Sequence, residues 1–129
     1  MKEVYPIIIS KEKDGYYVEI PTFNTATQGN NLADAIFMAR DAIGLLGITI
    51  EDSGEEIPKP VLENIEKQKD TDILTLVDVD FSEYRKKHDN RTVKKNCTVP
   101  YWLCCEAEKE GINFSQTLQE ALKEKLGIK

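Results

Sequence analysis

The sequence predicts an α+β protein in two parts, a β-β-β-α-(α)-β domain followed by a β-α-α segment. Three observations support this class: β-rich runs separated by turn signals come first, one long run with helical period follows, and a strand with two short helices comes last. We assign residues 1–80 to the first domain, 81–90 to a linker and 91–129 to the second domain. The chain's 129 residues suit one domain, or a small domain plus a dimerising appendage.

Three strands are predicted near the N-terminus. Tyr5–Ser10 is apolar and β-rich, and Pro6 within it indicates a sheet edge or the start of a strand. The Asp-Gly pair at 14–15 predicts a hairpin turn, so Tyr16–Ile20 returns as the second strand. Thr25–Gln28 is predicted as a short third strand.

One helix is predicted to cross this sheet. Asn31 is a typical helix cap, and Asp34 follows three residues later, as in a capping box. Apolar residues then follow the helical period over about 15 residues: Leu32, Ala35, Ile36, Ala39, Ile43 and Leu46. Phe37 and Met38 lie off this stripe, where they either cover the sheet edge or offer a surface to a partner.

A loop, a possible helix and a fourth strand complete the first domain. Ile48–Lys59 is polar and acidic, which indicates a loop. Val61–Lys69 could form a short helix, and Ile73–Asp80 is predicted as the fourth strand. The following residues, Phe81–Asn90, form a hinge or a short helix, and their basic run Arg85–Lys87 is more typical of a solvated face than of a nucleic-acid contact.

The strand predicted at Thr92–Val99 has two different faces. Val93, Lys95, Cys97 and Val99 alternate on one face, which is mostly apolar. The other face consists of Lys94, Asn96 and Thr98. These side chains suit the major groove of DNA, because Lys reaches guanine or phosphate, Asn recognises adenine and Thr contacts the thymine methyl. An ordinary solvated face is the alternative.

Two helices follow this strand. Pro100 is expected at the first position of one helix and Gly111 just after its end. Asn113 and Ser115 open the second, which runs to about Leu126 and begins without an acid, so its free N–H groups suit a phosphate. Ser115 as a plain helix cap is the compatible alternative. A segment this short cannot enclose a core, so a second copy is expected to complete it.

The order strand–Pro–helix–Gly–Asn-x-Ser–helix in residues 91–126 resembles a ribbon-helix-helix (β-α-α) DNA-binding domain. The resemblance implies that the strands of two subunits pair in antiparallel fashion and lie in the major groove. Lys94, Asn96 and Thr98 would then face the bases, and Asn113 with Ser115 would meet the phosphates.

The chain as a whole resembles a HicB-type antitoxin through DGYYVEIP, TQGNNLADAIFMARDAIGLL, EEIPKP and VDVDFSEY. This resemblance implies a truncated RNase-H-like first domain without nuclease activity. The implied partner is a HicA-type toxin, a small basic ribonuclease that cleaves mRNA. We expect an antitoxin that occludes the toxin's active site and, as a homodimer or a tetramer, binds operator DNA to autoregulate its operon. The toxin interface is not assigned to residues.

Charge and composition agree with these partners. Residues 1–90 have a net charge of −8, with 10 Lys/Arg and 18 Asp/Glu, which favours a basic protein partner. Residues 91–129 have a net charge of +2, and the basic excess lies at Arg91, Lys94 and Lys95. Three cysteines form no disulfide framework, and no run is long enough for a membrane span or a secretory signal, so we expect a reduced, cytoplasmic protein.

We expect no catalysis, no metal and no cofactor. Asp78 and Asp80 share one strand face, but the sequence assigns no further acid to a two-metal site beside them. His88 has no recognisable nucleophile nearby, and Cys97, Cys104 and Cys105 are expected to pack, with a reactive thiol as the alternative. Two other functions remain open: a stand-alone ribbon-helix-helix transcription regulator whose first domain senses a ligand or oligomerises, and a minimal Mg²⁺-dependent RNase-H-like nuclease.

Overall fold

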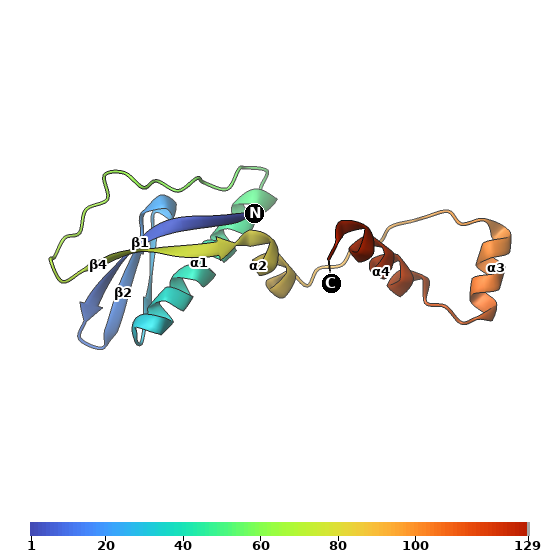
Figure 1. The fold of residues 1–129 in the computed structure, drawn as a ribbon, viewed down its shortest axis with the longest axis horizontal. Helices are drawn as coiled ribbons and strands as arrows, with labels where there is room; N and C mark the ends of the chain where they lie inside the picture. Colours follow the sequence, from blue (N-terminus) through green and yellow to red (C-terminus); the bar gives the residue numbers. More distant parts are fainter. Residues whose placement is uncertain (129) are drawn as a thin grey trace. The chain divides into compact units, whose positions relative to one another are not determined.

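The computed structural model describes residues 1–128 and divides into two compact units, Met1–Arg91 and Thr92 onward (Figure 1). Within these residues the fold is mixed α+β, with one four-stranded antiparallel sheet and four α-helices. No helix of the described part is long and apolar enough to cross a membrane. The sheet lies entirely in the first unit.

The sheet has the strand order β3-β2-β1-β4. Its strands are β1 (Lys2–Glu12), β2 (Gly15–Ile20), β3 (Thr25–Gly29) and β4 (Ile73–Asp80). All four were predicted, although β1 begins earlier than expected. The Asp-Gly turn joins β1 to β2 as a hairpin, because the chain reverses there and the two strands pair directly.

Pro6 lies inside an inner strand, contrary to the prediction of an edge or a strand start. It is opposite Leu76 of β4, whereas the first residue of β1 with a partner in β2 is Ile8. Pro6 therefore precedes the β1–β2 ladder. No residue of β2 is opposite Pro6. The absence of an N–H in proline therefore removes no hydrogen bond between β1 and β2 there.

Helix α1 (Leu32–Asp52) covers one face of the sheet and forms the core with it (Figure 1). Asn31 caps it as predicted, because its Oδ1 accepts from the Asp34 N–H at 2.8 Å. The Asp34 carboxylate accepts in turn from the Asn30 N–H at 2.8 Å. The fully or nearly buried core residues come from three strands and two helices: Tyr5, Ile7, Ile9, Val18, Ile20, Ala35, Ala39, Ile43, Ile48, Val77, Val79 and Phe81.

The chain between α1 and β4 differs from the prediction at both ends. Helix α1 continues to Asp52, so the first residues of the predicted loop 48–59 are helical. The predicted helix at Val61–Lys69 is absent, and Asn64 has a left-handed φ of 60°, which interrupts any right-handed helix. Tyr5 instead ties this segment to the sheet by donating to the Pro58 carbonyl at 2.8 Å.

Helix α2 (Phe81–His88) packs against α1 within the first unit, which settles the hinge-or-helix alternative for these residues. Asp80 caps it by accepting from the Glu83 N–H at 3.2 Å. Gly44 and Gly47 of α1 lie directly beneath the rings of Tyr84 and Phe81. The absence of a side chain at both positions lets the two helices approach closely.

Substitution of Gly47 by alanine is expected to destabilise the first unit by about 1–3 kcal/mol, the usual cost of overpacking. The added Cβ would overlap the Phe81 ring, and this outweighs the gain of up to ~1 kcal/mol in helix propensity. Urea unfolding measures the change. The double variant Gly47→Ala/Phe81→Leu should lose less than the sum of the two single variants. A Gly47→Ala protein as stable as wild type would contradict this packing.

The second unit consists of α3 (Tyr101–Lys109) and α4 (Phe114–Leu126) after an extended segment. Residues 92–99 form no strand in the single chain, although one was predicted there. A strand needs a neighbouring strand for its hydrogen bonds, and no other strand is available within this unit. Pro100 is the residue before α3 rather than its first residue, and Gly111 has the predicted left-handed φ, 66°.

Candidate nucleic-acid interface

The three predicted base-contacting residues, Lys94, Asn96 and Thr98, are exposed in the extended segment before α3. The alternate face of this segment is exposed as well. Val93 has 79% of its surface accessible, and Cys97 is exposed rather than packed as predicted. Nothing in the described chain covers these apolar side chains.

Arg91 differs from Lys94 and Lys95, because ion pairs hold it in the first unit. Its guanidinium lies 2.8 Å from the Asp89 carboxylate and 3.1 Å from that of Asp52. The carboxylate of Asp89 raises the pKa of Arg91, and the Arg91 guanidinium lowers the pKa of Asp89. Without Arg91, the excess of basic over acidic residues in the second unit is smaller than predicted. Thr92 onward contains six Lys and five Glu and no other charged side chain.

Arg85 belongs to the same network, so the predicted solvated face at 85–87 holds only in part. Its guanidinium contacts Glu51 at 2.9 Å, Asp52 at 3.0 Å and Asp89 at 3.3 Å. The carboxylates of Glu51 and Asp52 raise the pKa of Arg85 against the opposing effect of burial. The network joins the end of α1 to α2 and fixes the last residues of the first unit.

Asn113, rather than Ser115, caps α4. Its Oδ1 accepts from the Gln116 N–H at 3.0 Å, and the first backbone bond along the helix runs from the Thr117 N–H to the Asn113 carbonyl. The N–H groups of Phe114 and Ser115 therefore precede the helical ladder, where they are available to an anion. The first turn of α4 contains no acid, and the Ser115 side chain is exposed.

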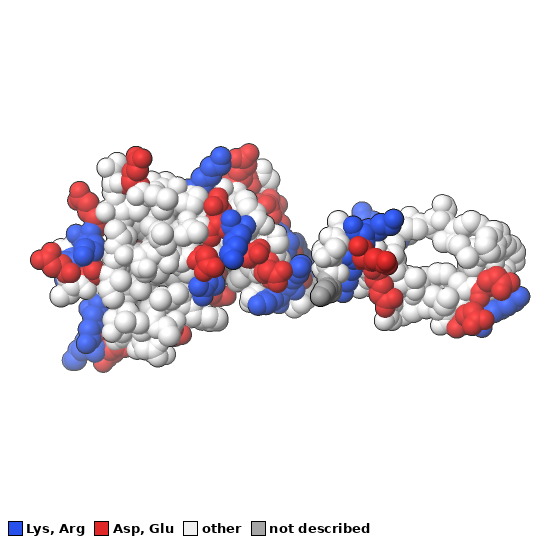
Figure 2. All heavy atoms as spheres, in the orientation of Figure 1, with Lys and Arg blue, Asp and Glu red and all other residues white. Residues whose placement is uncertain are grey.

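The second unit has no buried residue among residues 92–128. Its apolar side chains lie open along both helices and the segments beside them: Val99, Tyr101, Trp102, Leu103, Ile112, Phe114, Leu118, Leu122 and Leu126. In Figure 2 much of the visible surface of this unit carries no charged atoms. Chains this small rarely fold alone without a buried core, so we expect a partner to cover these side chains.

The two adjacent cysteines are half-buried on α3. Burial raises the pKa of the Cys104 thiol, and a hydrogen bond to Glu108 at 3.5 Å raises it further. Since the thiolate is the reactive form, the reactive-thiol alternative is disfavoured for Cys104.

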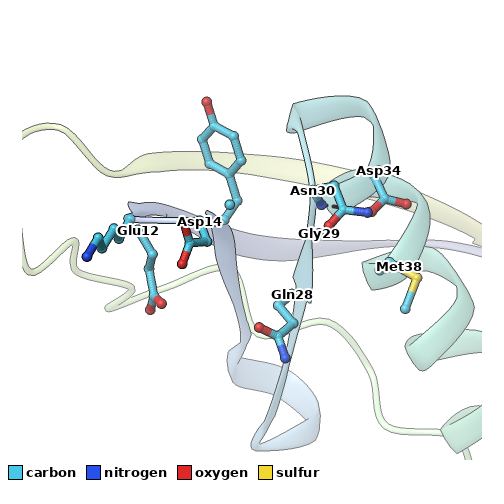
Figure 3. Close-up of a pocket in the computed structure, with 10 residues that line it drawn as sticks. Glu12, Asp14, Gln28, Gly29, Asn30, Asp34 and Met38 are labelled. Atoms are coloured by element: carbon cyan, nitrogen blue, oxygen red, sulfur yellow. Dashed lines mark hydrogen bonds between the residues drawn. The ribbon is translucent and has the colours of Figure 1, made fainter.

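Asp78 and Asp80, the two acids considered for a metal site, have structural partners. Arg40 bonds the Asp78 carboxylate at 3.1 Å and lowers its pKa, and Asp80 caps α2. Asp34 lines a hollow of about 610 Å³ with Glu12 and Asp14, where it also holds the start of α1 (Figure 3). No group of three His, Cys, Asp or Glu among residues 1–128 could hold a metal ion.

His88 is the last residue of α2, and the exposed Phe37 of α1 lines a hollow with it. The His88 ring stacks on Tyr84 with ring centres 4.0 Å apart, and its Nδ1 lies 3.0 Å from the Tyr84 carbonyl. Tyr84 also donates to the Asp41 carboxylate at 3.0 Å. Phe37 and Met38 are at least partly exposed on α1, so neither belongs to the buried core.

Comparisons with known proteins give one family model and a phage relative. Residues 5–121 match the model of the HicB-like antitoxin of bacterial toxin–antitoxin systems. A 14.9 kDa uncharacterized protein from the rep–hol intergenic region of Haemophilus phage HP1 is 35% identical over 104 residues, which cover 78% of this chain and 75% of the phage protein.

Solved structures are similar over nearly the whole chain. A toxin–antitoxin complex from Streptococcus pneumoniae contains a chain that is 27% identical, with a TM-score of 0.59 and coverage of 97% of this chain and 99% of that one. The Burkholderia pseudomallei antitoxin HicB has the same fold, with a TM-score of 0.54, 23% identity and 97% coverage of both chains. With 117 of its 129 residues matched by the family model, this chain belongs to the HicB-like antitoxin family of bacterial toxin–antitoxin systems.

Proposed function

We propose that this antitoxin neutralises a HicA-type toxin with its first unit and binds operator DNA with its second. The first unit would be the truncated RNase-H-like domain, since α1 lies on one face of a four-stranded sheet. The second would form a ribbon-helix-helix dimer. The absence of any buried residue in residues 92–128 is the observation that carries the second half of the proposal.

Dimerisation would give the exposed segment hydrogen-bond partners and would cover the apolar side chains of both helices. Antiparallel pairing of residues 92–99 with a second copy would supply the missing hydrogen bonds. The same pairing would place Val93 and Val99 over the leucines of α4, where they would lose their exposed apolar surface. Lys94, Asn96 and Thr98 would then point away from this core toward the bases of operator DNA.

The start of α4 would clamp the DNA backbone on each side of the paired strands. The N–H groups of Phe114 and Ser115, at the positive end of the helix dipole, suit a phosphate, and the Ser115 hydroxyl lies beside them. Lys94 and Lys95 add local positive charge to an otherwise acidic chain. Such contacts make operator affinity fall steeply with salt.

The acidic first unit would bind the toxin. With ten basic and eighteen acidic residues in 1–90, it attracts a small basic protein, and Figure 2 shows Asp and Glu side chains across its visible face, with Lys and Arg between them. Occlusion of an active site requires a specific interface of roughly 1,200–2,000 Å² in total. Toxin bound at one unit can then change operator affinity at the other by adding contacts or clashes.

Co-expression with the small basic protein encoded beside this gene tests the toxin half. We expect the basic protein alone to arrest growth and degrade mRNA, and this chain to restore growth and co-purify with it. A catalytically inactive variant of the basic protein should still co-purify, because occlusion needs no turnover. If the basic protein is harmless alone, or still arrests growth beside this chain, the proposed neutralisation is wrong.

A further inference from the structure

The two edges of the sheet differ in length and in chemistry. Strand β3 forms one edge with five small or polar residues, Thr25–Gly29. Strand β4 forms the other edge with eight residues, and its apolar side chains at Ile73, Leu74 and Leu76 are exposed. Long apolar edge strands pair readily with other chains, so proteins usually cover or blunt them.

The register shows where these side chains lie. Leu74 is opposite Ile8, Leu76 is opposite Pro6, and Asp78 is opposite Val4. Directly opposed residues share a face, so Leu74, Leu76 and the exposed Val4 form an apolar strip on the face away from buried Val77. Helix α1 covers the opposite face, where Val77 and Val79 pack in the core. We call Leu74, Leu76 and Val4 the β4 strip.

Arg40 closes one end of this edge. Its Nε donates to the Asp78 carbonyl at 2.9 Å, while its Nη2 donates to the Asp78 carboxylate at 3.1 Å. The Asp78 end of β4 is therefore blunted by a side chain from α1. The stretch from Ile73 to Val77 is left as the part of the edge that a second strand could join.

The charge around β4 limits which kind of strand could pair with its open edge. Residues 70–80 contain four acids, Asp70, Asp72, Asp78 and Asp80, and no Lys or Arg. A second copy related by twofold symmetry would run antiparallel and bring the acids of one β4 toward those of the other. Arg40 and Lys2 offset Asp78, and the Met1 amino group lies 4.0 Å from the Asp80 carboxylate. Like charges oppose self-pairing, whereas a basic strand would be attracted.

We propose that the open edge of β4 and the β4 strip dock a strand of the basic toxin, which extends the antitoxin's sheet. This inference rests on the proposed toxin binding and names the surface responsible for it. Main-chain hydrogen bonds to the open edge would give affinity, and the toxin's apolar side chains would cover Leu74 and Leu76. The flanking acids would guide the basic partner into place.

Leu76→Asp in the full-length chain tests the surface. Leu76 is 56% exposed, so the variant should fold, while a charge in the centre of an interface should weaken binding to catalytically inactive toxin by at least ~30-fold, measured by calorimetry. Leu45→Asp is the matched control, because Leu45 is 54% exposed but lies on α1. We expect this control to bind the toxin like wild type.

Hydrogen exchange on the wild-type complex gives a second measurement that needs no variant. The outward-facing amides of Leu74 and Leu76 should become protected when toxin binds. Full binding by Leu76→Asp, or unchanged exchange at β4, would overturn the inference and leave toxin binding intact. A wild-type chain that binds no toxin would refute the proposed function itself. Protection of β4 by self-association without toxin would overturn the inference in favour of a second copy.

Discussion

Leu122→Lys is expected to convert the antitoxin to a monomer and to abolish operator binding. Leu122 lies on α4 in line with Leu118 and Leu126, and all three are exposed in the single chain. In the proposed dimer this seam is the core. Loss of a buried leucine costs about 2–5 kcal/mol, and a symmetric dimer loses two. Dimer affinity should therefore fall by ~1,000-fold or more.

Light scattering measures the oligomeric state of this variant, and circular dichroism measures its helix content. Helices α3 and α4 should lose much of their structure in the monomer, because helices this short are marginal without tertiary packing. Leu45→Lys is the matched control, since Leu45 is 54% exposed but lies in the first unit. A dimeric Leu122→Lys protein with full operator affinity would show that the α4 seam is not the interface.

The features predicted well from the sequence are those set by local chemistry. Strand β4 begins and ends where predicted, at Ile73 and Asp80, because a β-rich run there is bounded by polar residues. The hairpin follows from the Asp-Gly pair, whose Gly15 has a φ of 148° that other residues rarely adopt. Asn31 caps α1 because its side chain and the Asp34 N–H are neighbours in the chain.

The features missed depend on contacts between distant residues. The end of α1 looked like a loop because it is acidic, yet Glu51 and Asp52 are held there by Arg85, which comes some 34 residues later. Gly44 and Gly47 do not break the helix, since each leaves room for an aromatic ring of α2. Contacts between residues this far apart in the chain cannot be predicted from the pattern of neighbouring residues.

In the candidate interface the base-contacting residues stay a prediction, and the charge balance differs from the one that the sequence indicated. Alternation placed Lys94, Asn96 and Thr98 on one face, and all three are exposed. Arg91 was counted with them because it is adjacent in sequence, whereas the fold pairs it with Asp52 and Asp89. At α4 the sequence analysis named Ser115 as the possible cap, whereas hydrogen-bond geometry shows that Asn113 caps the helix.

Replacement of Lys94, Asn96 and Thr98 together by alanine is expected to reduce specific operator binding to the non-specific level, a loss of about 1,000-fold or more. In the proposed complex these side chains make the base contacts, each worth roughly 1–3 kcal/mol. Asn96→Ala alone should mainly relax the preference for adenine at one position of the operator. Titration of labelled operator and scrambled duplexes at fixed salt measures both effects.

The triple variant should remain a folded dimer, because exposed side chains away from the core contribute little to stability. Residual binding should still weaken with salt, since the N–H groups at the start of α4 continue to contact phosphates. Lys13→Ala removes a positive charge from the first unit and should leave operator affinity unchanged. An undiminished shift of the operator by the triple variant would mean that this strand face does not contact the bases. The exposed segment before α3 would then serve dimerisation alone.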